Sequence, residues 1–186
     1  HLHLLDLKSG ATRRLAVELD RSVADGTISD MGAPRGDGQR LAWRADSRAV
    51  RFTTADRGQG QLVEAMLDGR HRVLTALAAG EVRAFDASVR DRVAVVHSGP
   101  AQPPELRAFA ARDAARESAW TALTRFNAPL VARHGFVDYE EFWYESTAPH
   151  VVDFPGRTGP RQWIQGWILK PPGFDPARRH PLVLYV

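Results

Sequence analysis

The chain has 186 residues, of which 44% are hydrophobic, enough for one compact domain or two small ones. Its 25 basic and 22 acidic residues give a net charge of +3, and the mostly arginine positive charge is scattered through predicted strands and turns. This pattern favours a solvated surface over a nucleic-acid-binding face. The absence of cysteine excludes disulfides and thiolate metal sites, and no apolar run approaches the ~20 residues that cross a membrane.

We therefore expect no nucleic-acid or membrane partner. A chain without cysteine is compatible with the cytoplasm, which is the expected location.

Residues 1–125 carry a loose internal repeat, in which a strand, a polar turn and a second short strand lead to a leucine. Turns such as Ser9-Gly10 and Asp68-Gly69 supply the positive φ that tight hairpins need. Three units show the pattern: residues 2–15, 62–75 and 106–124.

Two further hairpins lie between these units, and their apolar and polar residues alternate with period two. They span residues 41–54 and 82–96. The repeat units end at Leu15, Leu74 and Leu123, at roughly the 40–50 residue spacing of four-stranded propeller blades once loop insertions are allowed. The sequence therefore predicts the end of one blade and two further blades, the C-terminal part of a β-propeller.

The composition changes after Thr124, and residues 126–186 are predicted to begin a second domain. Asn127 can cap a short helix that has Pro129 in its first turn, and Gly135 ends it. This helix is expected to link the two domains.

Three strands are expected after the helix, with a surface loop rich in proline and glycine over 147–161. They span residues 140–146, 163–169 and 181–186. We expect the second strand to be covered on both faces, and the third, an unbroken apolar run, to lie inside a sheet with helices on both faces. A buried strand at the very C-terminus, and a first strand that begins at His1 without an initiator Met, predict an internal segment of a longer protein.

The order of these segments resembles a known family. The predicted propeller ends in Leu-Thr-Arg-Phe-Asn at 123–127, a Glu-Phe-aromatic strand follows, and Gly-Trp-Ile-Leu-Lys-Pro-Pro-Gly-Phe-Asp-Pro at 166–176 leads to the strand at 181–186. This order resembles the prolyl oligopeptidase family of serine peptidases, in particular its acylaminoacyl-peptidase and dipeptidyl-peptidase-like bacterial members. The resemblance is strong over 120–186 and rests on pattern alone over 1–119.

The resemblance implies a propeller that caps an α/β-hydrolase domain and admits only short peptides. The predicted fold is therefore mainly β, with the last propeller blades followed by the first, incomplete strands of an α/β-hydrolase domain. The intact enzyme would hydrolyse short peptides or acyl-peptides through an acyl-enzyme, without a cofactor. Its Ser/Asp/His triad would lie beyond this segment, which needs the rest of the same polypeptide and is not expected to be active alone.

Two other functions stay open. A non-enzymatic propeller that serves as a binding scaffold would suit residues 1–119, but it has no use for the segment 162–186. An esterase with an unrelated N-terminal cap would not predict blade repeats. Exposed blade edges also leave self-association into a homo-oligomer open.

No residue of this chain is assigned a catalytic role, and the substrate-binding residues are not identified. No serine lies in a Gly-x-Ser-x-Gly turn, and the nearest imitation, Ser98 in His-Ser-Gly-Pro, lacks the preceding glycine and the following helix. We predict Ser98 to be a turn residue. Gly58-Gln59-Gly60 lacks the third glycine of a dinucleotide loop and leads into a strand, so it is not predicted to bind phosphate.

Histidines and carboxylates form no predicted metal site. His1 and His3 share a strand face without a third ligand nearby. Trp163 and Trp167 are explained by core packing. His134 and His150 are predicted to be solvated, and His180 to line the turn before the strand at 181–186. The acidic residues are predicted to be solvated on one exposed strand face, where contact with a substrate amino terminus is a minor alternative: Asp138, Glu140, Glu141 and Glu145.

Overall fold

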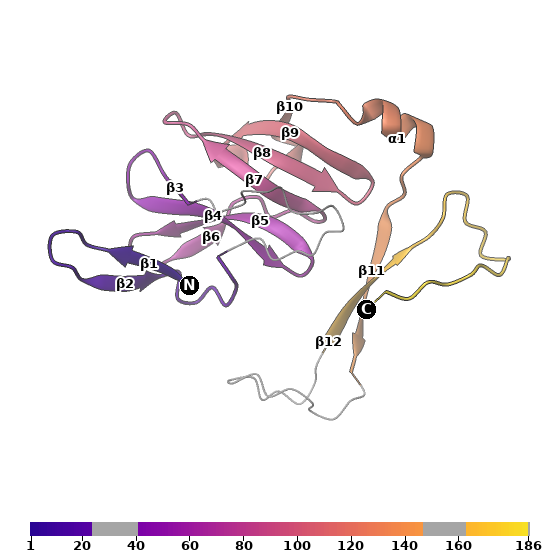
Figure 1. Cartoon of the computed structure of the whole chain (residues 1–186), viewed down its shortest axis with the longest axis horizontal. Helices are drawn as coiled ribbons and strands as arrows, with labels where there is room; N and C mark the ends of the chain where they lie inside the picture. The colour runs from indigo at the N-terminus through magenta and orange to yellow at the C-terminus, as the bar shows by residue number, and fades with distance from the viewer. Residues whose placement is uncertain (24–40, 147–162, 186) are drawn as a thin grey trace.

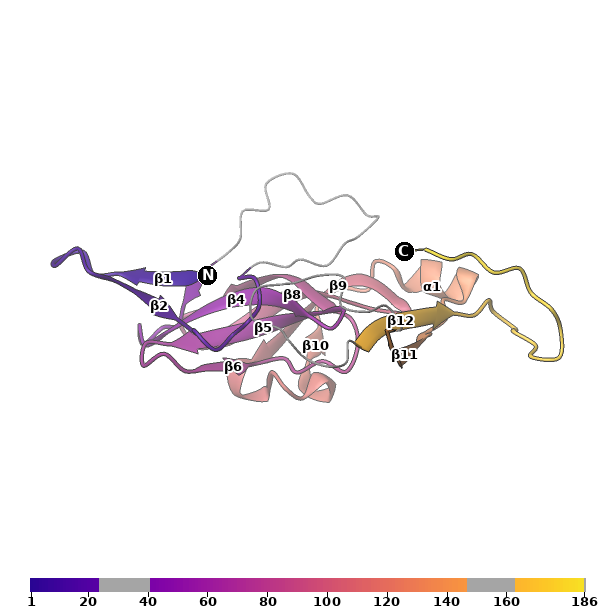
Figure 2. The same ribbon diagram turned by 90° about the horizontal axis from the view of Figure 1, so that it is seen from below.

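Antiparallel strands dominate the chain, of which the computed structural model describes residues 1–23, 41–146 and 163–185. They form a hairpin at one end, two joined four-stranded units in the middle and a second hairpin at the other end, as Figures 1 and 2 show. The mainly β class predicted from the sequence is confirmed. None of the described helices is long and apolar enough to cross a membrane.

The first hairpin pairs β1 (Leu2–Leu5) with β2 (Thr12–Leu15). Its turn is closed by the Asp6 carboxylate, which accepts hydrogen bonds from the backbone N–H groups of Lys8 and Ser9, each at 2.9 Å. Gly10 adopts a φ of 71°, as the Ser-Gly signal predicted. The first unit of the repeat is therefore a hairpin.

Two four-stranded antiparallel meanders follow, each with the topology of a propeller blade. Within each meander, consecutive strands pair antiparallel, as the period-two patterns and hairpin turns predicted. The first consists of β3 (Ala42–Trp43), β4 (Ala49–Asp56), β5 (Gln59–Met66) and β6 (His71–Val73). The second consists of β7 (Glu81–Ala87), β8 (Arg92–Gly99), β9 (Gln102–Ala110) and β10 (Thr121–Ala122), with the short 3-10 helices η1 (Ala111–Asp113) and η2 (Glu117–Ala119) before β10.

In the first meander, the central strands β4 and β5 are buried on both faces. Neighbouring residues of a strand point to opposite faces, so Leu62 and Val63 of β5 enter different apolar clusters. Leu62 packs with the second meander, including Phe109 and Trp120, whereas Val63 packs with the β1–β2 hairpin. The three β units therefore stack face to face.

The two meanders meet at one parallel pair, between Gly60 of β5 and Glu81 of β7. A Cβ on Gly60 would lie 2.8 Å from the Glu81 Cβ, so only glycine allows this approach. Close packing against β7 therefore explains the glycine at position 60.

The predicted short helix is confirmed as α1 (Ala128–His134), and Gly135 ends it with a φ of 59°. Asn127 occupies the N-cap position, but its side chain makes no capping bond; it donates to the Pro104 carbonyl at 2.8 Å. The expected side-chain cap is therefore wrong, because tertiary contact with β9 takes the amide.

A second hairpin follows, in which β11 (Tyr139–Glu145) pairs with β12 (Trp163–Leu169). The strand predicted at 163–169 is confirmed, but its expected burial on both faces is wrong: Trp163 is 57% and Leu169 68% exposed. A two-stranded sheet that packs on the rest of the described chain mainly through one turn cannot cover both faces of a strand.

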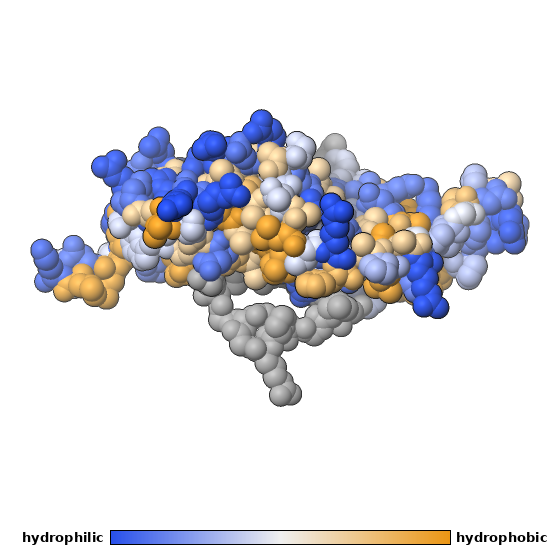
Figure 3. Space-filling view, turned by 90° about the horizontal axis from the view of Figure 1, so that it is seen from above, coloured by the Kyte–Doolittle hydropathy of each residue, from blue (hydrophilic) through white to orange (hydrophobic). Residues whose placement is uncertain are grey.

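The strand predicted at 181–186 is not formed over the described residues 181–185. This segment is irregular and unpaired, and Leu182 is 88% exposed. Beyond β12 the chain runs outward and then back (Figure 2). On the face of the molecule drawn in Figure 3, hydrophobic residues are exposed among hydrophilic ones. An apolar run becomes a buried strand only beside a strand that supplies hydrogen-bond partners, and no described strand lies there.

Candidate functional site

The turn between β4 and β5 docks on the second hairpin. Gln165 Nε2 of β12 donates to the Arg57 carbonyl oxygen at 3.0 Å. Gly58 lies against the indole ring of Trp167, so close that an added Cβ would sit 2.4 Å from Cζ2. Arg57 and Gly58 both have positive φ, 51° and 69°, which turns the chain tightly beneath the ring. This contact joins the first meander to β12.

A cavity of about 490 Å³ opens beside this turn, between the first meander and β11. Its volume falls in the range of small-molecule sites, roughly 300–1,000 Å³. Its apolar lining comes from the meander and the segment after β6, while β11 adds an aromatic side chain and a carboxylate. The lining residues are Leu19, Arg21, Thr54, Asp56, Arg57, Gln59, Gln61, Val73, Ala76, Leu77, Glu141 and Trp143.

Most polar groups of this cavity are held by partners within the chain. Arg21 and Asp56 form an ion pair at 2.7 Å. The side-chain Oε1 of Gln61 accepts from the Thr75 hydroxyl at 2.9 Å and from the Leu77 backbone N–H at 3.1 Å. Gln59 donates to the Ala78 carbonyl at 2.7 Å. These groups are preorganised and have little capacity left for a ligand.

Two charges at the cavity are less occupied. Glu141 accepts one hydrogen bond, from the Trp143 indole N–H at 2.6 Å, which leaves acceptor capacity on its carboxylate. The Arg57 guanidinium makes no hydrogen bond or ion pair with any residue that the structure describes. Among the described residues, the cavity therefore presents one cation without a partner and one partly satisfied anion beside apolar side chains.

A buried ion-pair network lies in the first meander, away from this cavity. Glu64 is fully buried, and its carboxylate contacts the guanidinium groups of Arg44, Arg51 and Arg72, each at 2.9 Å. Arg51, also buried, reaches the Asp91 carboxylate of the β7–β8 turn at 2.6 Å. The network ties the two meanders together, and its donors and acceptors satisfy one another, which indicates a structural role.

Sequence reasoning missed this network. Arg51 and Glu64 are directly opposite each other in the β4–β5 register. Opposite charges at paired positions of two predicted strands were the available signal.

His97 of β8 is also a buried ionisable group, and it lies outside the ion-pair network of Glu64. Its ring packs edge-on against Trp120 at 5.3 Å between centroids, and its Nε2 lies 3.9 Å from a Glu117 carboxylate oxygen. Neither ring nitrogen has a hydrogen-bond partner among the described residues. Burial lowers the pKa of His97 from its ordinary value of 6.5; Glu117 raises it less, and Arg107 adds to the lowering.

The residues weighed as candidates from the sequence do not come together. Ser98 lies within β8 and its hydroxyl donates to Glu81 at 3.2 Å, so its expected place in a turn is wrong. His1 lies 3.0 Å from an Arg14 guanidinium nitrogen, and His3 points outward from β1. In the part of the chain that the structure describes, no three metal-ligating side chains cluster.

The other histidines lie apart. His134 is exposed at the end of α1, and His150 lies outside the described residues. His180 lies 3.0 Å from the Asp175 carbonyl oxygen and 4.7 Å from the Phe174 ring, measured between centroids.

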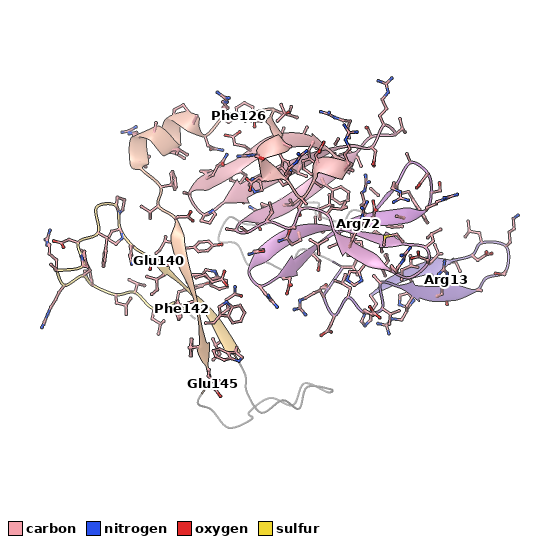
Figure 4. All side chains as sticks on the ribbon, turned by 180° about the vertical axis from the view of Figure 1, so that it is seen from behind. Arg13, Arg72, Phe126, Glu140, Phe142 and Glu145 are labelled. Atoms are coloured by element: carbon pink, nitrogen blue, oxygen red, sulfur yellow. The ribbon has the colours of Figure 1, made fainter. Side chains whose placement is uncertain are left out.

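The acidic residues before and in β11 were expected to be solvated on one strand face. All four are exposed, but they do not share a face. Glu140 and Glu141 are consecutive, so their side chains point to opposite faces. Glu140 forms an ion pair with Lys170, whereas Glu141 lines the cavity. Asp138 precedes the strand and accepts the Tyr139 backbone N–H at 3.1 Å, and Glu145 ends β11 (Figure 4).

The two tryptophans predicted as core are partly exposed. Trp167 packs against Gly58 and edge-on to Tyr139 but remains 44% exposed, and Trp163 is more open.

No protein-family model and no curated protein matches the chain. Among solved structures, it is similar to Pyrococcus horikoshii acylaminoacyl peptidase in an orthorhombic crystal form, with a TM-score of 0.52 and 18% sequence identity. The match covers 86% of this chain and 19% of the peptidase, so the chain spans about a fifth of its neighbour's length. At this identity the likeness shows a related fold.

Proposed function

We propose that this chain is a segment of a serine peptidase that hydrolyses short peptides or acyl-peptides. The supporting observation is the fold shared with part of an acylaminoacyl peptidase over 86% of the chain. The order of two blade-like meanders, a short helix and a β hairpin agrees with the resemblance drawn from the segment at 120–186. One fold can carry several unrelated activities, so the peptidase activity is tested directly below.

In this proposal residues 1–125 are the last part of a propeller, and 126–186 are a linker helix and the first strands of an α/β-hydrolase domain. The junction is held by Glu105 of β9, whose carboxylate accepts from the Thr124 hydroxyl and from the Asn127 backbone N–H at 2.7 Å. Together with the Gly58–Trp167 contact, it gives the linker and the hairpin defined positions against the meanders.

The chemistry would be supplied by residues outside this segment. In a serine peptidase a serine attacks the peptide carbonyl while a histidine takes its proton. The histidine then gives this proton to the departing amine as the peptide bond breaks, and water hydrolyses the acyl-enzyme. No cofactor is required. This chain would contribute the framework that restricts access and carries the hydrolase strands, and would be inactive without the rest of the polypeptide.

The proposal includes the expected partners and location. The substrate is a short peptide, nucleic acid and membranes are not partners, and the protein acts in the cytoplasm, with self-association as an open alternative.

The rival proposal is a non-enzymatic propeller scaffold. The hairpin β11–β12, docked on the first meander through Arg57 and Gly58, favours the peptidase because a closed propeller does not need it.

The first test is the intact mass of the natural polypeptide that contains this sequence, combined with labelling by a fluorophosphonate and hydrolysis of N-acetyl-alanine p-nitroanilide. We expect a mass well above 20.6 kDa, one phosphonate per chain and release of nitroaniline. A larger polypeptide that takes up no phosphonate and hydrolyses neither acylated nor free peptides would support the scaffold instead.

A further inference from the structure

The cavity between β11 and the β4–β5 turn has the features of a ligand site that the proposed chemistry does not use. It combines apolar side chains with a guanidinium that has no partner among the described residues, on a turn that is fixed by other contacts. Arg57 is held through its backbone, because its carbonyl oxygen accepts from Gln165 and the next residue packs against Trp167. The backbone of Arg57 is therefore fixed beside the cavity, and its side chain is exposed there.

The charges around the cavity favour an anionic group at Arg57. Arg21 is neutralised by Asp56 at 2.7 Å, and Glu141 already accepts the Trp143 indole N–H. The cation without a described partner is thus Arg57. A guanidinium binds a carboxylate through two parallel hydrogen bonds, which makes a carboxylate a well-matched partner.

The floor and wall of the cavity favour an apolar group beside that carboxylate. Val73 and Leu77 line the cavity from the end of β6 and the loop after it, and the indole of Trp143 faces them from β11. The partly free Glu141 carboxylate adjoins the indole and can accept an N–H from a ligand. A carboxylate, an N–H and an apolar side chain together describe the C-terminal residue of a peptide.

We propose that this cavity binds the C-terminal residue of a short peptide or an acylated amino acid. The ligand carboxylate pairs with Arg57, its side chain packs between Val73 and Trp143, and its amide N–H donates to Glu141. The inference rests on the proposed function for the ligand class, since peptides and acyl-amino acids are substrates or products of such an enzyme. The site itself is defined by the described residues alone.

The test is calorimetric titration of the natural polypeptide that contains this sequence. The titrants are N-acetyl-leucine, N-acetyl-leucine amide, N-acetylglycine and inorganic phosphate. We expect the acid to bind at least tenfold more tightly than the amide, which lacks the carboxylate. N-acetylglycine, which lacks the apolar side chain, should also bind at least tenfold more weakly. Phosphate binding equal to that of N-acetyl-leucine would overturn the proposal in favour of a general anion site.

Two variants locate the binding. Arg57→Gln should weaken the acid at least tenfold and leave the amide unchanged, whereas Trp143→Phe should weaken both moderately. The matched control is Arg13→Gln: Arg13 is exposed on β2, at the far end of the molecule from β11 (Figure 4), so affinity should not change. Equal weakening of acid and amide in Arg57→Gln would contradict the assigned contact, as would wild-type affinity.

The outcomes separate this site from the proposed activity. Carboxylate-dependent binding in a natural polypeptide that takes up no fluorophosphonate would leave the site standing and reject the peptidase. Full phosphonate labelling without binding of any N-acetyl amino acid would reject the site and leave the peptidase proposal intact.

Discussion

Gly58 lies so close to the ring of Trp167 that no other residue fits between the β4–β5 turn and β12 without a shift. The two residues are more than a hundred positions apart in the chain. Their contact, with the hydrogen bond from Gln165 to the Arg57 carbonyl, places β11 beside the first meander and so creates the cavity.

Replacement of Gly58 by alanine should separate the hairpin from the meander. The added Cβ meets Trp167, and the positive φ of 69° costs about 1–2 kcal/mol for a residue with a side chain. Gly10→Ala is the matched control, because Gly10 has a φ of 71° and nothing within 4 Å of an added Cβ. Both variants should lose stability in chemical denaturation, but only Gly58→Ala should change tryptophan fluorescence. Unchanged fluorescence in Gly58→Ala would contradict the contact.

Removal of the Glu64 carboxylate should be among the most destabilising single changes. Glu64→Ala leaves the buried Arg51 without this partner, and such a loss costs about 3–5 kcal/mol. Asp68→Ala breaks an exposed pair with Arg70, which water and salt screen, and should cost far less stability. Urea denaturation measures both. Similar values for the two variants would show that the buried network contributes little.

A double replacement of Arg51 by Met and Glu64 by Leu should recover much of the lost stability. Apolar side chains of similar size remove the need to pair a buried charge. If the double variant has the same free energy of unfolding as Glu64→Ala, the loss of packing explains the destabilisation better than the unpaired charge.

His97 should make the protein less stable in mild acid. Its folded-state pKa is lowered by burial, so the unfolded chain takes up a proton near pH 6.5 while the folded chain stays neutral. The free energy of unfolding is therefore unaffected by the protonation of His97 above pH 6.5. It decreases as the pH falls from 6.5 toward the folded-state pKa. Glu117 opposes this lowering of the pKa, and Arg107 adds to it. His97→Phe should flatten the pH dependence of urea midpoints below pH 6.5, whereas the exposed-site control His3→Gln should not.

Thr124→Val should raise the pKa of Glu105. The Thr124 hydroxyl is the main cause of its lowered pKa, followed by the Asn127 backbone N–H. Because the folded-state pKa lies below the ordinary 4.5, Glu105 stabilises the fold above that pH, and this contribution is lost as the pH falls through the folded-state value. NMR titration of the Glu105 carboxyl measures the shift. An unchanged pKa in the variant would show that the hydroxyl does not hold the carboxylate.

The sequence by itself determined the local structure of this protein. Period-two alternation and turn glycines such as Gly10 and Gly69 specify hairpins, since they depend on the conformations of a few adjacent residues. The short helix ending at Gly135 was predictable for the same reason. These local signals were enough for the mainly β class and the strand order of the meanders.

Only the tertiary structure decided which polar groups are paired and which surfaces are covered. Asn127 donates to the Pro104 carbonyl instead of capping its helix, and the exposed Glu141 also lines a cavity. The apolar run at 181–185 stays open because a strand needs a neighbour, which local sequence cannot supply. Contacts between distant segments, such as Gly58 with Trp167, depend on how whole units stack, and periodicity within one segment carries no information about that.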